Sequence, residues 1–299
     1  PNSVINRRIL SNKLTFFLSE RLFKKGLVKI FHYKLWLQIW SNIIAYNKNT
    51  HLLCDGSFVG KDFAAIGLSK KKMWKHGYFP VFEKYDLQQL IFVKEHSMVN
   101  ILWVGRIIYW KEPLEFIKAI KMVRDSDLSV KIHVDIVGSG TSALEEEIKT
   151  YLVQNSMQDM VIYHGLKSNE TVVAMMEKAN IFVSTSNKQE GWGAVVNEAM
   201  NRGCAVVVSD AVGCAAYLIK DQENGMIYRS GSPSDLCSKL KYLIHNRQHM
   251  REMGRNAYDT IANKWNGEIA AERFLQLIED IKNNSKPSYL DGPCSRDFP

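Results

Sequence analysis

The stretch IFVSTSNKQEGWGAVVNEAMNRGCAVVVSD, residues 181–210, decides the fold. Its two ends, 181–186 and 204–210, are apolar runs of the kind found in strands that are covered on both faces. Between them, residues 194–202 are expected to form a helix, and Gly203 suits the position just after a helix C-terminus. The stretch therefore predicts a strand, a loop, a helix and a second strand.

The same alternation continues on both sides of this stretch. Strands are expected at 100–105, 131–138 and 160–165, and helices at 112–125, 142–155, 169–179 and 232–246. A capping box from Ser142 to Glu145 is expected to open one helix. Ser232 as N-cap and Pro233 as the first helical residue are expected to open another. The pattern predicts a doubly wound parallel α/β sheet over about residues 98–260, in which ligands bind outside the carboxyl ends of the strands.

Composition is that of a globular protein of two ordinary domains. The 299 residues are 46% apolar and 23% charged. No apolar run reaches the ~18 residues of a membrane span, and no signal peptide is recognisable. The chain begins with proline, which suggests that its natural start lies upstream. The five scattered cysteines predict reduced thiols in a cytoplasmic protein, without a disulfide framework or a zinc site.

Positive charge is concentrated in the first third of the chain. Residues 1–100 hold 16 Lys/Arg against 6 Asp/Glu, and the remainder holds 23 against 25. The segment RLFKKGLVKIFHYKLWLQIW, residues 21–40, mixes lysines with aromatic residues. It is interpreted either as a face for an anionic membrane or acceptor, or as a solvated helix with buried aromatics. Nucleic-acid binding is not favoured, because no known motif accompanies the charge.

Glycine and basic residues mark the predicted strand ends. Gly105, Arg106 and Lys111 can clamp a diphosphate, although both basic residues could equally be ordinary surface groups. The sequence Gly-Ser-Gly at 138–140 is interpreted as a tight turn and not as an NAD fingerprint, because no acidic residue ends the next strand. The turn at 165–167 could place backbone groups against a nucleobase edge.

Two carboxylates bracket the loop and helix of the opening stretch. Glu190 precedes the helix, Glu198 lies on it, and both could accept hydrogen bonds from vicinal hydroxyls of one ligand. Gly191 and Gly193 permit close backbone approach and leave amides free at a helix N-terminus. The alternative is that Glu190 complements the helix dipole and Glu198 is a solvated helical residue. That alternative leaves the paired glycines and the basic clamp unexplained.

Taken together, these motifs resemble the retaining GT-B glycosyltransferases of the family 4 type, also called glycosyl transferases group 1. The resemblance lies in GRIIYWK (105–111) and in EGWGAVVNEAMNRGCAVVVSD (190–210), and it covers about residues 98–282. It implies a Rossmann-like nucleotide-sugar domain at 98–264 after a truncated N-terminal α/β domain at 1–97. It also implies a helix at 265–284 that crosses back to the N-terminal domain. The polar tail at 285–299 is expected to be loosely ordered.

The resemblance also implies a role for each motif residue. Arg106 and Lys111 would bind the donor diphosphate, Glu198 would hold the ribose, and Glu190 would contact the donor sugar. Arg106, Lys111 and Glu190 would be the catalytic residues, and no metal or other cofactor would be needed. Further donor contacts are implied for Gly105, Gly138, Leu166, Gly191, Trp192 and Gly193.

The function implied is transfer of a hexose from a nucleotide diphosphate sugar, preferably a UDP-sugar, to a glycan or lipid-linked acceptor. The anomeric configuration would be retained, and the enzyme would act in the cytoplasm at the inner face of a membrane. The N-terminal segment is shorter than the family's full acceptor domain, and that domain's features are not visible in it. The alternative is therefore a non-catalytic nucleotide-sugar-binding fragment, and an NAD enzyme is disfavoured.

Overall fold

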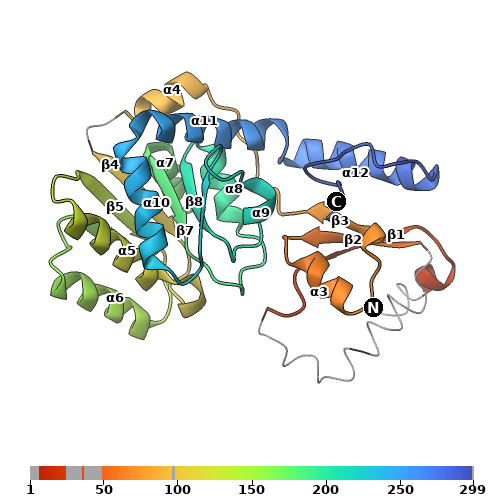
Figure 1. Cartoon of the computed structure of the whole chain (residues 1–299), viewed down its shortest axis with the longest axis horizontal. Helices are drawn as coiled ribbons and strands as arrows, with labels where there is room; N and C mark the ends of the chain where they lie inside the picture. Colours follow the sequence, from red (N-terminus) through yellow and green to blue (C-terminus); the bar gives the residue numbers. More distant parts are fainter. Residues whose placement is uncertain (1–6, 25–35, 37–48, 96–97, 298–299) are drawn as a thin grey trace. The chain divides into compact units, whose positions relative to one another are not determined.

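The computed structural model describes residues 7–24, 36, 49–95 and 98–297 and forms two compact units (Figure 1). The first unit comprises the described residues up to Tyr78 together with those from Glu268 onward, and the second comprises Phe79–Gly267. Among the helices of these described ranges, none is long and apolar enough to cross a membrane.

The second unit contains a six-stranded sheet in which every strand pair is parallel. Its strands, in spatial order, are β6 (Val161–Tyr163), β5 (Ile132–Val137), β4 (Val99–Val104), β7 (Ile181–Ser184), β8 (Ala205–Ser209) and β9 (Met226–Tyr228). This is the 3-2-1-4-5-6 order of dinucleotide-binding sheets, and it reverses between β4 and β7. The doubly wound parallel sheet predicted from the sequence is therefore confirmed.

Helices cover both faces of this sheet (Figure 1). Ile101 of β4 packs in one core with Phe116 and Leu240, whereas the next residue, Leu102, packs in a second core with Val196. Burial on both faces explains why the strands are continuously apolar. The helices of this unit are α4 (Leu87–Val93), α5 (Pro113–Ser126), α6 (Ser142–Gln154), α7 (Asn169–Lys178), α8 (Ala194–Asn201), α9 (Ala215–Leu218), α10 (Pro233–His245) and α11 (Arg247–Asn263).

The helix-end predictions are confirmed in two cases and wrong in one. Gly203 follows α8 with φ +64°, and the Ser232 side chain caps α10 by accepting from the amide of Asp235. The N-cap of α6, however, is Thr141, and Ser142 is already helical. The carboxylate at position 145 accepts instead from the amide of residue 140, 2.7 Å away, so the capping box does not form.

Residues 79–95 pack on the second unit, so the first boundary lies at Phe79, upstream of the expected residue 98. The amide of Tyr85 donates to the hydroxyl of Tyr258 at 3.0 Å. The buried ammonium of Lys94 donates to the backbone oxygens of Met176 and Ala179, which ties the end of α4 to α7. The sequence pattern missed this because α4 is short and its contacts lie far along the chain.

The first unit is built on a three-stranded parallel sheet of β1 (Thr15–Ser19), β2 (Thr50–Asp55) and β3 (Met73–His76), in the order β1-β2-β3. Around it lie α3 (Val59–Ala65), the 3-10 turn η3 (Lys70–Lys72) and α12 (Gly267–Lys282). Residues 7–10 are helical and precede the strand Thr15–Ser19. Most of the basic, aromatic segment 21–40 lies outside the described residues, so its interpretation stays a prediction.

The described part of the C-terminal tail, residues 285–297, belongs to the first unit and pairs with its sheet. Cys294 donates its amide to the carbonyl of Lys75, and Lys75 donates its amide to the carbonyl of Ser295, both at 2.8 Å. The guanidinium of Arg296 lies 3.9 Å from the ring centroid of Trp74. The tail thus pairs with the backbone of β3 at the edge of the sheet. Its polar composition gave no sign of this, because backbone pairing is independent of side-chain polarity.

Candidate functional site

A cavity of about 320 Å³ opens at the carboxyl ends of β4, β5 and β6 in the second unit. Its position next to the strand-order reversal is where sheets of this type bind ligands. The loops after these three strands and residues of two helices, α7 and α8, contribute to its wall. The lining residues are Val104, Gly105, Arg106, Val137, Gly138, Ser139, Leu166, Lys167, Asn169, Val172 and Glu198.

The floor of this cavity is backbone held by hydrogen bonds that extend the sheet beyond its strands. The amide of Gly105 donates to the carbonyl of Val137 at 3.0 Å, and that of Gly138 donates to the carbonyl of Gly165 at 2.9 Å. Gly138 has φ +141°, and a Cβ atom there would lie 1.8 Å from the carbonyl oxygen of Gly105. Only glycine lets the two turns approach this closely.

Two basic side chains follow β4, and an aromatic ring lies within reach of both. Arg106 is exposed at the cavity, with its guanidinium carbon 5.5 Å from the ring centroid of Trp110. The Lys111 ammonium lies 4.8 Å from the same centroid. Cation–π contacts of this kind favour fixed positions for both cations. The Arg106 guanidinium is therefore already positioned when an anion binds in the cavity.

Lys111 forms an ion pair with Glu190, and the Ser186 hydroxyl donates to the same carboxylate oxygen at 3.1 Å. Both members of the pair are largely buried, with side chains 15% and 13% exposed. Neither residue lines the 320 Å³ cavity. The structure therefore pairs two of the predicted catalytic residues, Lys111 and Glu190. They lie in the loops after β4 and β7, the two strands between which the strand order reverses.

A buried chain of hydrogen bonds fixes the loop that carries these cations. The indole N–H of Trp103 in β4 donates to the hydroxyl of Thr185 after β7 at 2.9 Å, and that hydroxyl donates to the carbonyl of Lys111 at 2.6 Å. The amide of Asn187 donates to the carbonyl of Trp110 at 2.9 Å. These bonds link the ends of β4 and β7, so the cations are positioned by the core of the sheet.

Glu198 supplies a carboxylate to the cavity wall from α8. Burial raises the pKa of this carboxyl above its usual value, and the nearby Arg202 guanidinium offsets part of the rise. A half-buried carboxylate facing a cavity is a strong acceptor for ligand hydroxyls, because little water competes with them. Of the two predicted glutamates, Glu198 is the one that reaches this cavity.

In the Gly-Trp-Gly segment before α8, residues 191–193, the backbone and not the tryptophan side chain is available to a ligand. Trp192 is 1% exposed, its indole N–H donates to Asn197 at 2.8 Å, and its ring packs in the core near Trp265. Gly193 is the N-cap of α8 in the left-handed region, with φ +90°. Any contact of Trp192 with a ligand would therefore use its backbone amide.

Several residues of this region were missed by the sequence reading. Trp110 and Ser186 contact the charged groups, and Thr185 anchors the loop. The signal for Trp110 was present, since an aromatic residue stands directly before a lysine in GRIIYWK. Nothing local marked the two hydroxyl residues, because their role depends on pairing between β4 and β7.

Lys111→Met is expected to lower the free energy of unfolding by about 2–3 kcal/mol, because it leaves the Glu190 carboxylate largely buried beside one hydroxyl. The double variant Lys111→Met/Glu190→Gln is expected to regain part of that loss. Urea unfolding of the two single variants and the double variant measures the coupling. Lys121→Met is the control, because it breaks the exposed Lys121–Asp125 pair and should cost less than about 0.5 kcal/mol. Equal losses for the two lysines would contradict a structural ion pair at the site.

The family comparison matches the chain to glycosyl transferases group 1 over residues 92–260. An uncharacterised glycosyltransferase of Methanocaldococcus jannaschii is 26% identical over 190 residues, which are 64% of this chain and 47% of that protein. A Campylobacter jejuni N,N'-diacetylbacillosaminyl-diphospho-undecaprenol alpha-1,3-N-acetylgalactosaminyltransferase is 25% identical over 222 residues, covering 74% and 54% respectively. The chain thus spans about half the length of these two curated relatives.

A likeness of fold extends over nearly the whole chain. The crystal structure of Anabaena HepE in complex with UDP has a TM-score of 0.70 and 14% identity, covering 94% of this chain and 75% of that one. The similarity is of fold, and it confirms the predicted GT-B type α/β architecture. Since the family match covers more than half of the residues, the chain belongs to the glycosyl transferases group 1 family.

Proposed function

We propose that the second unit binds a nucleotide diphosphate sugar, most favourably a UDP-sugar, as the donor for hexose transfer. The observation that carries the proposal is the placement of Glu198, Arg106 and the glycine turns at 105 and 138 around one cavity at the strand-order reversal. A carboxylate suits the ribose hydroxyls, and the exposed guanidinium suits the diphosphate. The UDP complex of the Anabaena structure supports the choice of nucleotide by fold analogy.

In the proposed reaction, an acceptor hydroxyl attacks the anomeric carbon on the face from which the diphosphate departs, while the bond from that carbon to the diphosphate oxygen breaks. The bonding electrons leave with the nucleoside diphosphate, and the hydroxyl proton passes to the departing phosphate oxygen. Arg106 and Lys111 stabilise the charge that develops there, so no metal ion is required. Glu190 holds the Lys111 ammonium in place and contacts the donor sugar. The configuration is retained, as the family resemblance implies.

The acceptor is proposed to be a glycan or a lipid-linked sugar. The name of the Campylobacter relative, which specifies a diphospho-undecaprenol-linked acceptor, supports this class. The excess of Lys/Arg over Asp/Glu in residues 1–100 supports action in the cytoplasm at the inner face of an anionic membrane.

The second candidate is a nucleotide-sugar-binding module without transfer activity, since the residues that line the donor cavity all belong to the second unit. A panel of UDP- and GDP-sugars separates the two, with binding followed by thermal shift and turnover by release of the nucleotide. Binding of a nucleotide sugar followed by release of its nucleotide supports the transferase. Binding of a nucleotide sugar from which no acceptor causes release of the nucleotide supports the module. No binding of any member of the panel would overturn both.

Donor affinity is expected to fall as the pH is lowered through the raised pKa of Glu198, because the neutral acid is a poorer acceptor for the ribose hydroxyls. The loss should begin at a higher pH than an ordinary glutamate would give. UDP-glucose is the suitable probe, since both of its phosphates are esterified and keep their charge over this range. Calorimetric titration should show this pH dependence in the wild type and a flatter profile in Glu198→Gln. Parallel profiles for the two proteins would contradict the ribose assignment.

A further inference from the structure

Glu112 has an unusual backbone conformation directly after one of the predicted catalytic residues. It follows the 3-10 turn η4 (Tyr109–Lys111) and is the N-cap of α5. Its φ of 52° and ψ of 47° lie in the left-handed region, which is strained for a glutamate and not for a glycine. Strain of this kind persists only where the surrounding structure imposes it, and it gathers at functional sites.

The side chain of Glu112 adds a second cost to stability. Its Oε2 atom is the only carboxylate oxygen among the buried side-chain atoms of the described residues that lack a hydrogen-bond partner. Burial raises the pKa of this carboxyl above its usual value, a hydrogen bond from Asn187 offsets part of the rise, and the charge of Glu115 adds to it. A buried oxygen to which nothing donates is destabilising.

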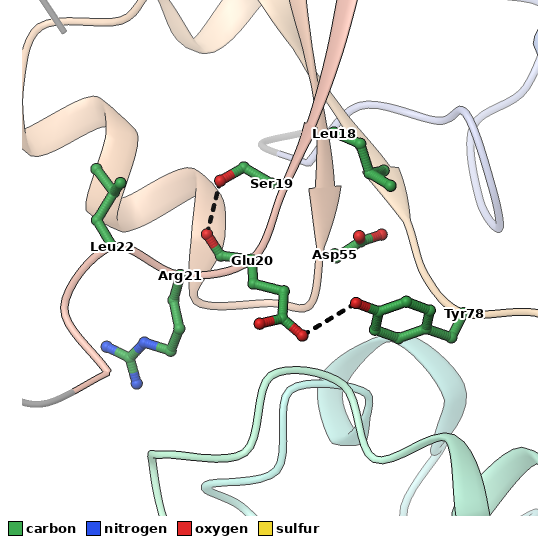
Figure 2. Close-up of a pocket in the computed structure, with 7 residues that line it drawn as sticks. All are labelled: Leu18, Ser19, Glu20, Arg21, Leu22, Asp55 and Tyr78. Carbon is green, nitrogen blue, oxygen red and sulfur yellow. Dashed lines mark hydrogen bonds between the residues drawn. The ribbon is translucent and has the colours of Figure 1, made fainter. Parts of the chain in front are cut away.

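Two carboxylates of the first unit show the more usual arrangement. Glu20 and Asp55 line a cavity of about 460 Å³ (Figure 2). Glu20 accepts from the Tyr78 hydroxyl at 3.1 Å, and Asp55 lies 2.8 Å from Nδ1 of His76. Neither carboxylate has a left-handed backbone or a buried oxygen without a partner. Glu112 combines both features, and this combination indicates a functional role.

The contacts of Glu112 lead to the loop that carries Glu190. Its carboxyl accepts a hydrogen bond from the side chain of Asn187, in the loop after β7. The amide of Asn187 donates to the carbonyl of Trp110 at 2.9 Å, and its carbonyl accepts from the amide of Glu190 at 3.0 Å. Glu190 in turn pairs with Lys111, the neighbour of Glu112. These contacts close a ring that joins the loops after β4 and β7.

We propose that Glu112 is a positioning residue, whose carboxyl acts through Asn187 to hold Glu190, and with it the Lys111 ammonium, in place for the donor. This role rests on the proposed transferase function. The left-handed conformation directs the carboxyl toward the loop after β7 while the preceding lysine faces Glu190. Glycine at this position would relieve the strain and would release the loop.

Glu112→Gly is expected to change stability and activity in opposite directions. Loss of the left-handed strain should raise the Tm by about 2–6 °C, and glycine is accepted at a helix N-cap. Loss of the contact with Asn187 should lower kcat for nucleotide release about tenfold, while KM for the UDP-sugar changes less than about threefold. Glu112→Gln keeps an acceptor for Asn187, so its kcat should stay within about threefold of the wild type.

Ser156→Gly is the matched control for the backbone effect. Ser156 also has a left-handed backbone, with φ 51°, and it lies exposed in the turn after α6. Its replacement should raise the Tm in the same way, because the same strain is removed. The rate of nucleotide release should remain that of the wild type.

Hydrogen exchange at the amides of Asn187 and Glu190 tests the positioning role without turnover. Exchange is expected to be about tenfold faster in Glu112→Gly and unchanged in Ser156→Gly. A lower Tm, unchanged exchange or an unchanged kcat in Glu112→Gly would overturn the proposal, as would a Glu112→Gln variant that is equally slow. If no protein, wild type included, released the nucleotide but the exchange difference were present, the transferase would be refuted and the hold of Glu112 on this loop would stand.

Discussion

Replacing Arg106 with alanine is expected to lower the rate of nucleotide release from the donor sugar about 100- to 1,000-fold, the usual cost of removing one preorganised stabiliser of developing charge. The guanidinium is exposed at the cavity and is held over Trp110. The Arg106 guanidinium can therefore bind the diphosphate without first breaking a buried interaction. The measurement is steady-state release of the nucleotide from the UDP-sugar that the panel identifies.

Two matched variants make this result specific. Arg106→Lys keeps the charge but removes the planar fork, so an intermediate rate is expected. Arg255→Ala removes an exposed arginine from α11, away from the cavity lining, and should leave the rate unchanged. A rate for Arg106→Ala within threefold of the wild type would remove this residue from the leaving-group role.

Gly138→Ala is expected to cost about 3 kcal/mol or more of folding stability and to abolish donor binding at practical concentrations. The added methyl group would lie 1.8 Å from the carbonyl oxygen of Gly105, which is backbone and cannot rotate away. The strand ends would have to separate, and that movement would displace the neighbouring arginine. Thermal unfolding and UDP titration measure the two effects.

Gly165→Ala is the matched control, since the same change is made in the neighbouring turn. Gly165 also has a positive φ, +66°, but nothing lies within 4 Å of the added methyl group. Only the left-handed backbone strain remains, which costs about 1–2 kcal/mol. Similar losses for the two variants would show that the close approach of the β4 and β5 turns is not a determinant of the fold.

Much of the second unit could be predicted from the sequence because its determinants are local. Continuous apolar strands such as Ala205–Ser209 alternate with helices whose ends carry recognisable residues, as at Gly203 and Ser232. β9 was missed because its apolar run is confined to Met226–Tyr228, between a glycine and an arginine, and α11 because no local signal separated it from α10. The strand order also follows from packing and could not be read from spacing.

The candidate site was only partly predictable for the same reason. Gly105, Arg106, Gly138, Leu166 and Glu198 were expected to come together, and the structure brings them around one cavity. The pairing of Lys111 with Glu190 was not foreseen, because it depends on the meeting of the loops after β4 and β7. In the first unit, the contact between Asp55 and His76 joins strands whose pairing had no readable pattern.

The crystal structure of the full chain with UDP bound tests the central claim most directly. The ribose hydroxyls are predicted to lie within hydrogen-bond distance of the Glu198 carboxylate, with the uracil over the turns at 138 and 165–166. The diphosphate is predicted to contact Arg106 and the backbone amides before α8. A nucleotide bound elsewhere, or one in this cavity with its ribose away from Glu198, would contradict the assignment.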